Sequence, residues 1–374
     1  MTRSFPEITG KLGFGCLRIP IVDGDIDFKP TCELIDAFLA SGNNYFDTST
    51  IYLNGKSEET VRRCVAERYP RDSFKVGNKM TGRLFETIED VNKAFDAQLQ
   101  ACGVEFFDFY MMHGLNREEY EKYSRVGLFD WAQQMKAQGK MGHVGFSFHD
   151  SATLLEKILD EHPEMEFVQL QVNYADYRDE TVQAEKCLQV CREHGKPVFV
   201  MEPNKGGILT GELPQAAAEI IARVAERENA TVGQLGMLFC GSIPEVEVIL
   251  SGMGSAREIT ENDAACRREE RLSEESFNEL LEVRPVLDAS GRIECTQCHY
   301  CHDACPMSID IPRLIGILNG CRAIKGGVQK CYYRTATTDR GKAGDCIGCR
   351  SCVSACPQEL PIPDLMAELA AIYE

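Results

Sequence analysis

The stretches FDFYMMH at residues 107–113 and HVGFSF at residues 143–148 decide the fold. Both are apolar and aromatic and have the length of buried β-strands, and residues 127–138 between them have a helical pattern. A strand, a helix and a second strand in this order predict a parallel β-α-β unit. The same alternation continues along the chain in both directions.

The complete pattern contains eight candidate strands, at residues 12–19, 45–47, 74–79, 107–113, 143–148, 167–171, 197–201 and 246–250. Helical patterns lie at 31–41, 58–68, 86–101, 127–138, 151–160, 180–194, 214–240, with a break near Asn229, and 256–283. Eight such units in about 250 residues are typical of a (β/α)8 barrel. A doubly wound sheet usually has a G-x-G-x-x-G turn before its first helix, whereas GFGCLR at 13–18 leads into a hairpin-like stretch. The barrel is therefore the favoured α/β fold.

The character of the sequence changes after residue 284. Residues 284–294, RPVLDASGRIE, combine Pro, Gly and small polar residues and predict a boundary between a barrel of residues 1–284 and a domain of residues 285–374. The chain has 374 residues and 18 cysteines, ten of them in residues 295–374. We find no apolar run suited to a membrane helix or a secretion signal, so we expect a cytoplasmic protein with no membrane partner.

The second domain contains one cysteine motif twice. Cys295, Cys298, Cys301 and Cys305 precede Pro306, and Cys346, Cys349, Cys352 and Cys356 precede Pro357, each as C-x2-C-x2-C-x3-C-P. Thiols of a protein without a secretion signal stay reduced, which argues against a disulfide framework. Structural zinc usually pairs two knuckles across a longer loop, whereas three closely spaced cysteines suit three corners of a cuboidal cluster. The motifs therefore predict two [4Fe–4S] clusters.

This domain resembles the two-cluster bacterial-type ferredoxins, and more closely their helical variant in respiratory iron–sulfur subunits. The resemblance implies one cluster on Cys295, Cys298, Cys301 and Cys356, and another on Cys346, Cys349, Cys352 and Cys305. Cys321 and Cys331 lack the spacing, and we interpret them as small buried hydrophobic residues. The eight cysteines of the first domain have the same interpretation.

The net charge of -18 is confined to residues 1–290, since residues 291–374 contain nine Lys or Arg and nine Asp or Glu. An acidic surface repels polyphosphate, which argues against nucleic acid as a partner. Residues 311–350 are basic, with eight Lys or Arg against Asp339 and Asp345. The cations are Arg313, Arg322, Lys325, Lys330, Arg334, Arg340, Lys342 and Arg350. They could attract an acidic ferredoxin or flavodoxin, but docking on the chain's own barrel or offsetting the cluster charge is the preferred interpretation.

Four polar residues lie at the carboxyl ends of consecutive candidate strands, where barrel enzymes place their active sites. Asp47 ends the second strand, Tyr52 follows in the loop, Lys79 ends the third strand and His113 the fourth. Each alone could have a structural role, but four on one rim favour catalysis. A nearby ammonium lowers the pKa of a phenol, which allows the phenol to protonate an alkoxide. In this hypothesis Asp47 holds Lys79 charged, and His113 orients a substrate carbonyl.

The surrounding segments resemble the aldo-keto reductase superfamily. They are YFDTSTIYLNGKSEETV at 45–61, VGNKM at 76–80, DFYMMH at 108–113 and GFS at 145–147. With the two-cluster domain, the chain resembles the ferredoxin-domain branch of that superfamily. The resemblance implies hydride transfer between NADP(H) or NAD(H) and a small-molecule carbonyl or alcohol. It gives Tyr52 the role of general acid or base, tuned by Lys79 and Asp47, with His113 as the orienting group.

The resemblance also implies cofactor-binding residues, namely Ser147, Gln171, Met201, Gly206, Gly207 and Ser255. Ser255 begins a helix whose N-terminus could receive a phosphate. Phe148 and Met201 replace the family's asparagine and stacking aromatic residue. Gly252 and Glu258 replace a lysine and an arginine, and Arg257 is one position away, so NAD and NADP are both open.

The sequence alone leaves the role of the two clusters open. A hydride carries two electrons and a [4Fe–4S] cluster passes one, so the clusters either stabilise the domain or exchange electrons with an external carrier. One alternative function is a nicotinamide-independent reductase supplied by ferredoxin or flavodoxin through the clusters, with flavin as a possible cofactor. A second alternative is a non-catalytic redox-sensing subunit.

Overall fold

The structure is a computed structural model. It describes residues 4–22, 25–179, 182–289, 291, 293, 295, 300–323, 333–334, 336–356 and 358–374. Cys298, Cys331, Lys325, Lys330 and Pro357 lie outside the described residues. The chain divides into two compact units, Met1–Asn204 with Val224–Asn278, and Lys205–Arg223 with Glu279–Glu374. The boundary expected after residue 284 stays a prediction, and Lys205–Arg223 groups with the C-terminal part of the chain.

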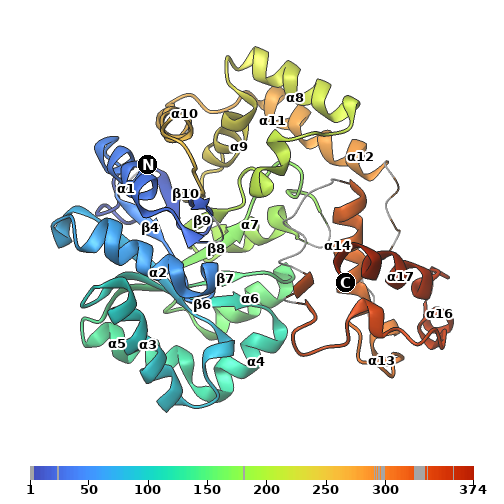
Figure 1. Ribbon diagram of the computed structural model, residues 1–374. Coiled ribbons are helices and arrows are strands. Elements are labelled where there is room, and N and C mark those ends of the chain that lie inside the picture. The colour runs from blue at the N-terminus through green and yellow to red at the C-terminus, as the bar shows by residue number, and fades with distance from the viewer. Residues whose placement is uncertain are drawn as a thin grey trace. The chain divides into compact units, whose positions relative to one another are not determined.

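The first unit contains a closed barrel of parallel strands in the order β1-β10-β9-β8-β7-β6-β5-β4. The strands are β1 (Leu12–Gly15), β4 (Tyr45–Asp47), β5 (Lys75–Met80), β6 (Phe107–Leu115), β7 (Met141–Phe148), β8 (Phe167–Gln171), β9 (Val198–Met201) and β10 (Val246–Ser251). Figure 1 shows them at the centre, with helices around them. The structure confirms the (β/α)8 barrel and all eight candidate strands.

The helices around the strands are α1 (Phe28–Ala40), α2 (Lys56–Val61), α3 (Ile88–Cys102), α4 (Arg117–Val126), α5 (Leu128–Ala137), α6 (Ala152–Glu161), α7 (Ala184–Glu193), α9 (Val232–Gly241) and α10 (Ala256–Arg267). Helices α8 (Gln215–Arg227) and α11 (Glu274–Leu281) each extend across the division between the units. The break expected near Asn229 is confirmed, because α8 ends at Arg227 and Asn229 has a φ of 48°.

Helix α4 has no counterpart among the predicted helices. Most of its residues are polar, and only Tyr120 and Tyr123 are buried, so its apolar face is narrow. Its ends are clear: the Asn116 side chain accepts a hydrogen bond from the Glu119 amide at 3.0 Å, and Gly127 ends the helix with a φ of 79°.

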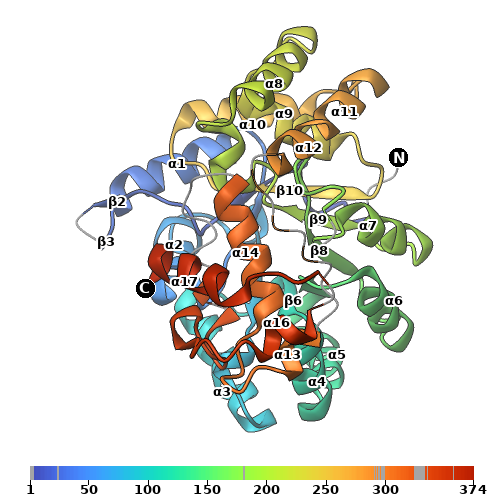
Figure 2. The ribbon, with the colours of Figure 1, turned by 90° about the vertical axis from the view of Figure 1, so that its right-hand side faces the viewer.

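The inside of the barrel is filled by aromatic and aliphatic side chains. Tyr45, Phe109, Phe167 and Phe199 form one buried cluster, into which Phe5 of the N-terminal segment packs. The hairpin of β2 (Ile21–Val22) and β3 (Asp25–Ile26) lies between β1 and α1 along the chain, and both of its strands are labelled in Figure 2. The hairpin-like interpretation of the stretch after the first strand is therefore confirmed.

One prediction about the barrel cysteines is wrong. Cys32 of α1 and Cys64 of the π-helical turn η2 (Arg62–Ala66) form a disulfide, 32 residues apart in sequence. Both lie in helical segments without a recognisable motif, so their pairing depends on a helix contact that spacing does not reveal. The other six, Cys16, Cys102, Cys187, Cys191, Cys240 and Cys266, are free thiols, and all except the half-buried Cys266 are buried.

The C-terminal part of the second unit is mainly helical, as the sequence predicts. Its helices are α12 (Val283–Asp288), α13 (Tyr300–Asp303), α14 (Ile311–Ala323), η6 (Ala343–Asp345), α16 (Ser351–Ala355) and α17 (Ile362–Tyr373). Leu314 and Leu318 of α14 and Met366 and Leu369 of α17 share one buried core. Among the described helices, none has the length and hydropathy that a membrane span requires.

Candidate functional site

A buried ion pair joins the ends of two neighbouring barrel strands. Asp47 is the last residue of β4, and Lys79 lies near the end of β5, which pairs with β4. The Lys79 Nζ atom lies 2.5 Å from Asp47 Oδ1 and 2.9 Å from the Thr48 carbonyl oxygen. The Lys79 side chain is 0% exposed and the Asp47 side chain 4%. Burial lowers the pKa of Lys79, and the charge and hydrogen bond of Asp47 oppose this shift.

Tyr52 and His113 lie next to this pair. Tyr52 opens the 3-10 turn η1 (Tyr52–Gly55), and the centre of its ring is 4.9 Å from Lys79 Nζ and 5.9 Å from the His113 ring. His113 Nδ1 lies 2.8 Å from Thr81 Oγ1 and 3.2 Å from Ser49 Oγ. Burial lowers the pKa of His113 well below its usual value, and the charge of Lys79 adds to this shift. The structure therefore brings together the four residues that the sequence placed on one rim.

The turn between β4 and η1 is held by one backbone hydrogen bond and by the hydroxyl groups of Thr48 and Ser57. The Tyr52 amide donates to the Ser49 carbonyl at 3.0 Å, which closes the turn before η1. The hydroxyls of Thr48 and Ser57 lie 2.7 Å apart, and Ser57 donates to the Cys16 carbonyl at 2.8 Å. The turn that carries Tyr52 is thereby attached to the end of β1.

Sequence reasoning missed three polar partners of this site. They are Ser49 and Thr81, which contact His113, and Gln169, whose Nε2 donates to Asp47 Oδ2 at 3.2 Å. A signal existed for Gln169, because it lies two residues before Gln171 in β8, so both side chains are on one side of the strand.

The residues expected to hold a nicotinamide lie at the ends of adjacent strands. Ser147 of β7 accepts a hydrogen bond from the Gly114 amide at 2.7 Å. Gln171 Nε2 at the end of β8 donates to Asp176 Oδ2 at 2.8 Å, and Gln171 is the register partner of Met201 at the end of β9. These three positions line one part of the carboxyl rim.

The N-terminus of α10 has its own anionic partner. Ser255 caps the helix, and Glu258 Oε2 accepts the amides of Gly254 at 2.6 Å and Ser255 at 3.1 Å. Arg257, one turn before Glu261, donates to that carboxylate at 2.7 Å. The Glu258 carboxylate therefore lies at the helix N-terminus where a phosphate was expected, and the role of Ser255 in cofactor binding stays a prediction.

Gly206 and Gly207 belong to the turn η5 (Lys205–Thr210) of the second compact unit. Their φ angles are 67° and 92°, a conformation that favours glycine. Their proposed role in cofactor binding stays a prediction.

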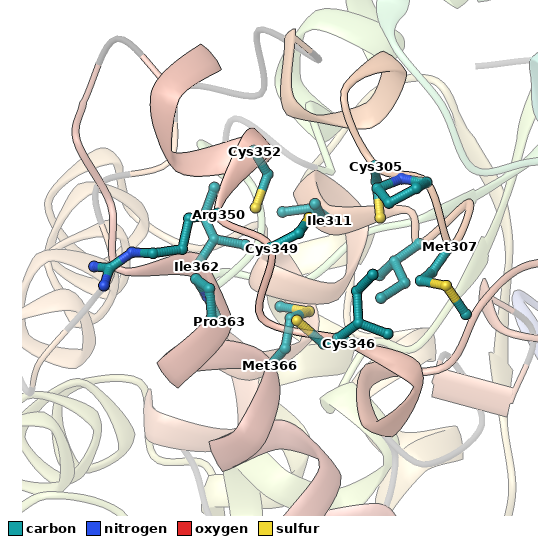
Figure 3. A pocket seen from close by; sticks show the side chains of 13 residues that line it. Cys305, Met307, Ile311, Cys346, Cys349, Arg350, Cys352, Ile362, Pro363 and Met366 are labelled. Atoms are coloured by element: carbon teal, nitrogen blue, oxygen red, sulfur yellow. The ribbon is translucent and has the colours of Figure 1, made fainter.

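Four cysteine thiols of the second unit surround one pocket. Cys305, Cys346, Cys349 and Cys352 line it together with apolar side chains that include Ile311 and Met366, and their sulfur atoms point toward one another in Figure 3. Burial raises the pKa of Cys352, and the nearby Cys346 and Cys305 thiols add to the shift. Among the described residues, no group of three or more His, Cys, Asp or Glu side chains is arranged to hold a metal ion. Four thiols at one pocket are the number and kind of ligands that a [4Fe–4S] cluster takes.

The remaining expected ligands are only partly described. Cys301 is buried in α13, and Cys295 and Cys356 are half-buried and pack against the same hydrophobic core. Cys298 lies outside the described residues, so the ligand set of Cys295, Cys298, Cys301 and Cys356 stays a prediction. Cys321 is half-buried, lies 3.1 Å from the Tyr373 hydroxyl and also packs against that core, and its non-ligating role stays a prediction.

Part of the basic segment is neutralised within the second unit. Arg322 forms an ion pair with Glu368 of α17, and Arg340 Nη1 lies 2.7 Å from His302 Nε2. The Asp345 carboxylate accepts the Lys342 backbone amide at 2.7 Å. Of these three contacts, the Arg322–Glu368 ion pair is the one that offsets positive charge of the segment.

Comparisons with known proteins agree with both halves of the chain. Residues 11–285 match the Aldo/keto reductase family, and residues 294–360 match a 4Fe-4S dicluster domain. The NADH-specific methylglyoxal reductase of Escherichia coli is 23% identical over 68% of this chain and 89% of its own length. An acetyl-CoA decarbonylase/synthase complex subunit alpha 1 of Methanosarcina barkeri is 29% identical over 27% of this chain and 12% of its own length.

The solved structures show the same barrel. An aldo-keto reductase of Klebsiella pneumoniae in complex with NADPH superposes with a TM-score of 0.56 at 20% identity, covering 74% of this chain and 91% of that chain. The aldo-keto reductase AKR11C1 of Bacillus halodurans gives a TM-score of 0.60 at 19% identity, covering 74% and 92%. Together with the closed barrel and the family match over residues 11–285, these findings show that the chain is an oxidoreductase that belongs to the aldo/keto reductase family and carries a 4Fe-4S dicluster domain.

Proposed function

We propose that the barrel interconverts a carbonyl and an alcohol with a nicotinamide cofactor, and that Tyr52 is the general acid or base. The observation that carries the proposal is the buried Asp47–Lys79 pair beside the Tyr52 ring, with 2.5 Å between Nζ and Oδ1 and 4.9 Å between Nζ and the ring centre. When it is bound, the nicotinamide supplies or accepts the hydride. The chain's own residues then have to bind the substrate oxygen and move one proton.

Lys79 favours the transfer of the Tyr52 proton. Its ammonium, held in place by Asp47, stabilises negative charge on the phenol oxygen, so Tyr52 can donate its proton to a carbonyl oxygen and later take it back. Because Lys79 is fully buried, its charge depends on Asp47, and water screens its effect on Tyr52 very little.

His113 is suited to orient the substrate oxygen as a neutral ring. Burial lowers its pKa, so the imidazole is uncharged near neutral pH. Thr81 and Ser49 hold Nδ1, which leaves Nε2 as the nitrogen that can donate to a carbonyl oxygen. A neutral donor orients the substrate without competing with Tyr52 for the proton.

We propose NADH as the preferred cofactor. The Glu258 carboxylate already accepts the Gly254 and Ser255 amides and would repel a 2′-phosphate, and the nearby Arg257 is paired with Glu261. The name of the Escherichia coli relative, an NADH-specific reductase, supports this choice. Glu258→Gln should narrow the difference between the NADH and NADPH dissociation constants, and equal constants in the parent protein would contradict the preference.

We also propose that the clusters exchange electrons with an external acidic carrier such as ferredoxin or flavodoxin. Cys349 is exposed, and the adjoining Ile347 is 63% exposed, so the thiol-lined pocket has an accessible edge. Arg350 also lines this pocket and provides positive charge for an acidic partner. A purely stabilising cluster would not need such an edge.

The test of catalysis is Tyr52→Phe, which keeps the ring and removes only the hydroxyl. With a panel of small aldehydes and ketones, we expect the anaerobic rate of NADH oxidation to fall about 10²- to 10⁴-fold while NADH binding persists. Tyr69→Phe is the matched control, since its hydroxyl bonds Asp36 on α1, away from this site. Full activity of Tyr52→Phe would refute the acid–base role, and an inactive parent protein would favour the sensor alternative.

The test of the clusters is an anaerobic spectral titration. NADH, NADPH and a reduced acidic carrier are added separately, and the visible absorbance of the clusters is followed. Bleaching by the carrier supports electron exchange. Clusters that no carrier reduces, at any ionic strength, would leave only the stabilising role.

A further inference from the structure

A buried carboxylate lies next to the turn of Tyr52 and has no part in the proton transfer described above. Glu58, in helix α2, is 3% exposed. Carboxylates are rarely buried unless they are paired or hydrogen-bonded, so its position calls for a specific partner.

One oxygen atom of Glu58 connects two segments of the site. Its Oε1 accepts the Thr50 hydroxyl at 2.9 Å and the Asn78 Nδ2 at 2.8 Å. Thr50 lies two residues before Tyr52, and Asn78 directly precedes Lys79. Glu58 therefore joins the turn that carries the phenol to the strand that carries the ammonium.

Gln98 of α3 completes this connection from a third element. Its Nε2 donates to Thr50 Oγ1 at 2.8 Å and to the Lys79 carbonyl at 2.8 Å, and its Oε1 accepts the Tyr110 hydroxyl. Thr50 therefore accepts from Gln98 and donates to Glu58, which fixes the direction of its hydroxyl. The backbone on both sides of the Tyr52–Lys79 contact is held by this network.

We propose that Glu58 is a positioning residue that sets the separation between Tyr52 and Lys79 by anchoring Thr50 and Asn78 to one atom. This inference rests on the proposed function, because it concerns the same acid–base pair. It assigns to Glu58 no contact with substrate or cofactor. A rigid support of this kind matters because small displacements of a catalytic group cost large factors in rate.

The anchor works through hydrogen bonding and does not require a charge on Glu58. Burial raises the pKa of Glu58, and the hydrogen bonds from Asn78 and Thr50 oppose the shift. The Oε1 atom accepts both hydrogen bonds in either protonation state. An amide at this position should therefore preserve the anchor, whereas a methyl group leaves Thr50 and Asn78 without their acceptor.

The variants are Glu58→Gln, Glu58→Ala and Thr50→Val, the last of which keeps the side-chain shape and removes one anchor. Glu228→Ala is the matched control, because Glu228 is 8% exposed and bonds Arg268 and Ser273 away from Tyr52. The readout is the pH midpoint at which the Tyr52 phenol titrates, followed by NMR of ¹³Cζ-labelled tyrosine. The signal missing from Tyr52→Phe identifies Tyr52, and no substrate is needed.

We expect Glu58→Ala and Thr50→Val to raise the midpoint by about half a unit to one unit, because Tyr52 moves away from the Lys79 charge. Glu58→Gln should restore the parent midpoint, and Glu228→Ala should lower only the stability. An unchanged midpoint in Thr50→Val, or an equal shift in Glu58→Gln and Glu58→Ala, overturns the inference. The titration stays informative if no carbonyl is reduced, so failure of the positioning role and failure of the proposed activity are distinguishable.

Discussion

Asp47→Asn removes the counter-charge of a lysine that has no contact with solvent, and its cost can be worked out from the contacts. Breaking a buried ion pair from one side costs about 3 to 5 kcal/mol, because the remaining charge is left uncompensated. The Thr48 carbonyl oxygen, 2.9 Å from Lys79 Nζ, still accepts a hydrogen bond from the ammonium in the variant. We therefore expect the loss of stability from the broken ion pair to lie near the lower end of this range. The new amide then faces Gln169 Nε2, a donor 3.2 Å from Asp47 Oδ2, which adds about 1 kcal/mol if two donors meet. We expect a loss of about 4 kcal/mol in the free energy of unfolding at neutral pH.

The loss should depend on pH with a defined sign. Burial already lowers the pKa of Lys79 in the folded protein, and without Asp47 the pKa falls further. Between the folded and unfolded pKa values the unfolded chain binds more protons, so stability rises with pH in that window. The deficit of the variant is therefore complete where Lys79 is protonated in both folded proteins, and it shrinks as pH rises through the folded pKa of Lys79 in the variant, because the folded variant then releases the proton. We expect a smaller deficit at about pH 9.5 than at about pH 7.

Urea unfolding followed by tryptophan fluorescence measures this change in the barrel alone. Trp131 of α5 is 4% exposed and is the one tryptophan in the sequence. Asp25→Asn, which breaks the exposed pair with Lys56, is the control and should cost less than about 1 kcal/mol. A loss in Asp47→Asn below about 1 kcal/mol, or one that is equal at both pH values, would refute the conclusion that Lys79 depends on Asp47 for its charge.

Three further outcomes are expected. Cys32→Ser opens the 32-residue span to Cys64 and should lower the free energy of unfolding by about 3 to 4 kcal/mol, and an unchanged urea midpoint would contradict the loop-closure argument. Cys349→Ser should lose about half of the bound iron, measured per chain after anaerobic purification, whereas full iron content would exclude this ligand. Burial opposes the charge of His143, but Glu166 and Glu7 outweigh burial and raise its pKa, so the stabilisation is present at low pH and is lost as pH rises through the folded pKa. His143→Gln should therefore reduce the thermal midpoint more at about pH 6 than at about pH 9, and equal reductions would show that the charge does not contribute.

The strands were predictable because parallel strands in a barrel are buried on both faces and appear as short continuous apolar runs. Polar residues that interrupt such runs at their carboxyl ends, such as Asp47, Lys79 and His113, were therefore visible as candidate site residues. Helix α4 was missed for the opposite reason, because a helix with two buried side chains has almost no apolar periodicity.

The contacts of the site residues were not predictable from spacing, although the place of Gln169 two residues before Gln171 indicated which side of β8 it faces. Gln169 contacts Asp47 across 122 residues of sequence, and Gln98 reaches Thr50 across 48. The Cys32–Cys64 disulfide was not predictable for the same reason, since it depends on how α1 and η2 pack. In contrast, the ligand set of Cys346, Cys349, Cys352 and Cys305 follows from the resemblance to two-cluster ferredoxins, and the structure gathers these four thiols around one pocket.

The grouping of Lys205–Arg223 with the C-terminal part of the chain affects how the protein can be truncated. The chain passes from one compact unit to the other after residues 204, 223 and 278, so no single cut separates them. Deleting the iron–sulfur part at one boundary would leave behind a segment between β9 and α9 whose structural neighbours have been removed. A truncation that keeps the first unit therefore has to deal with three crossings of the chain, two of which fall inside helices α8 and α11.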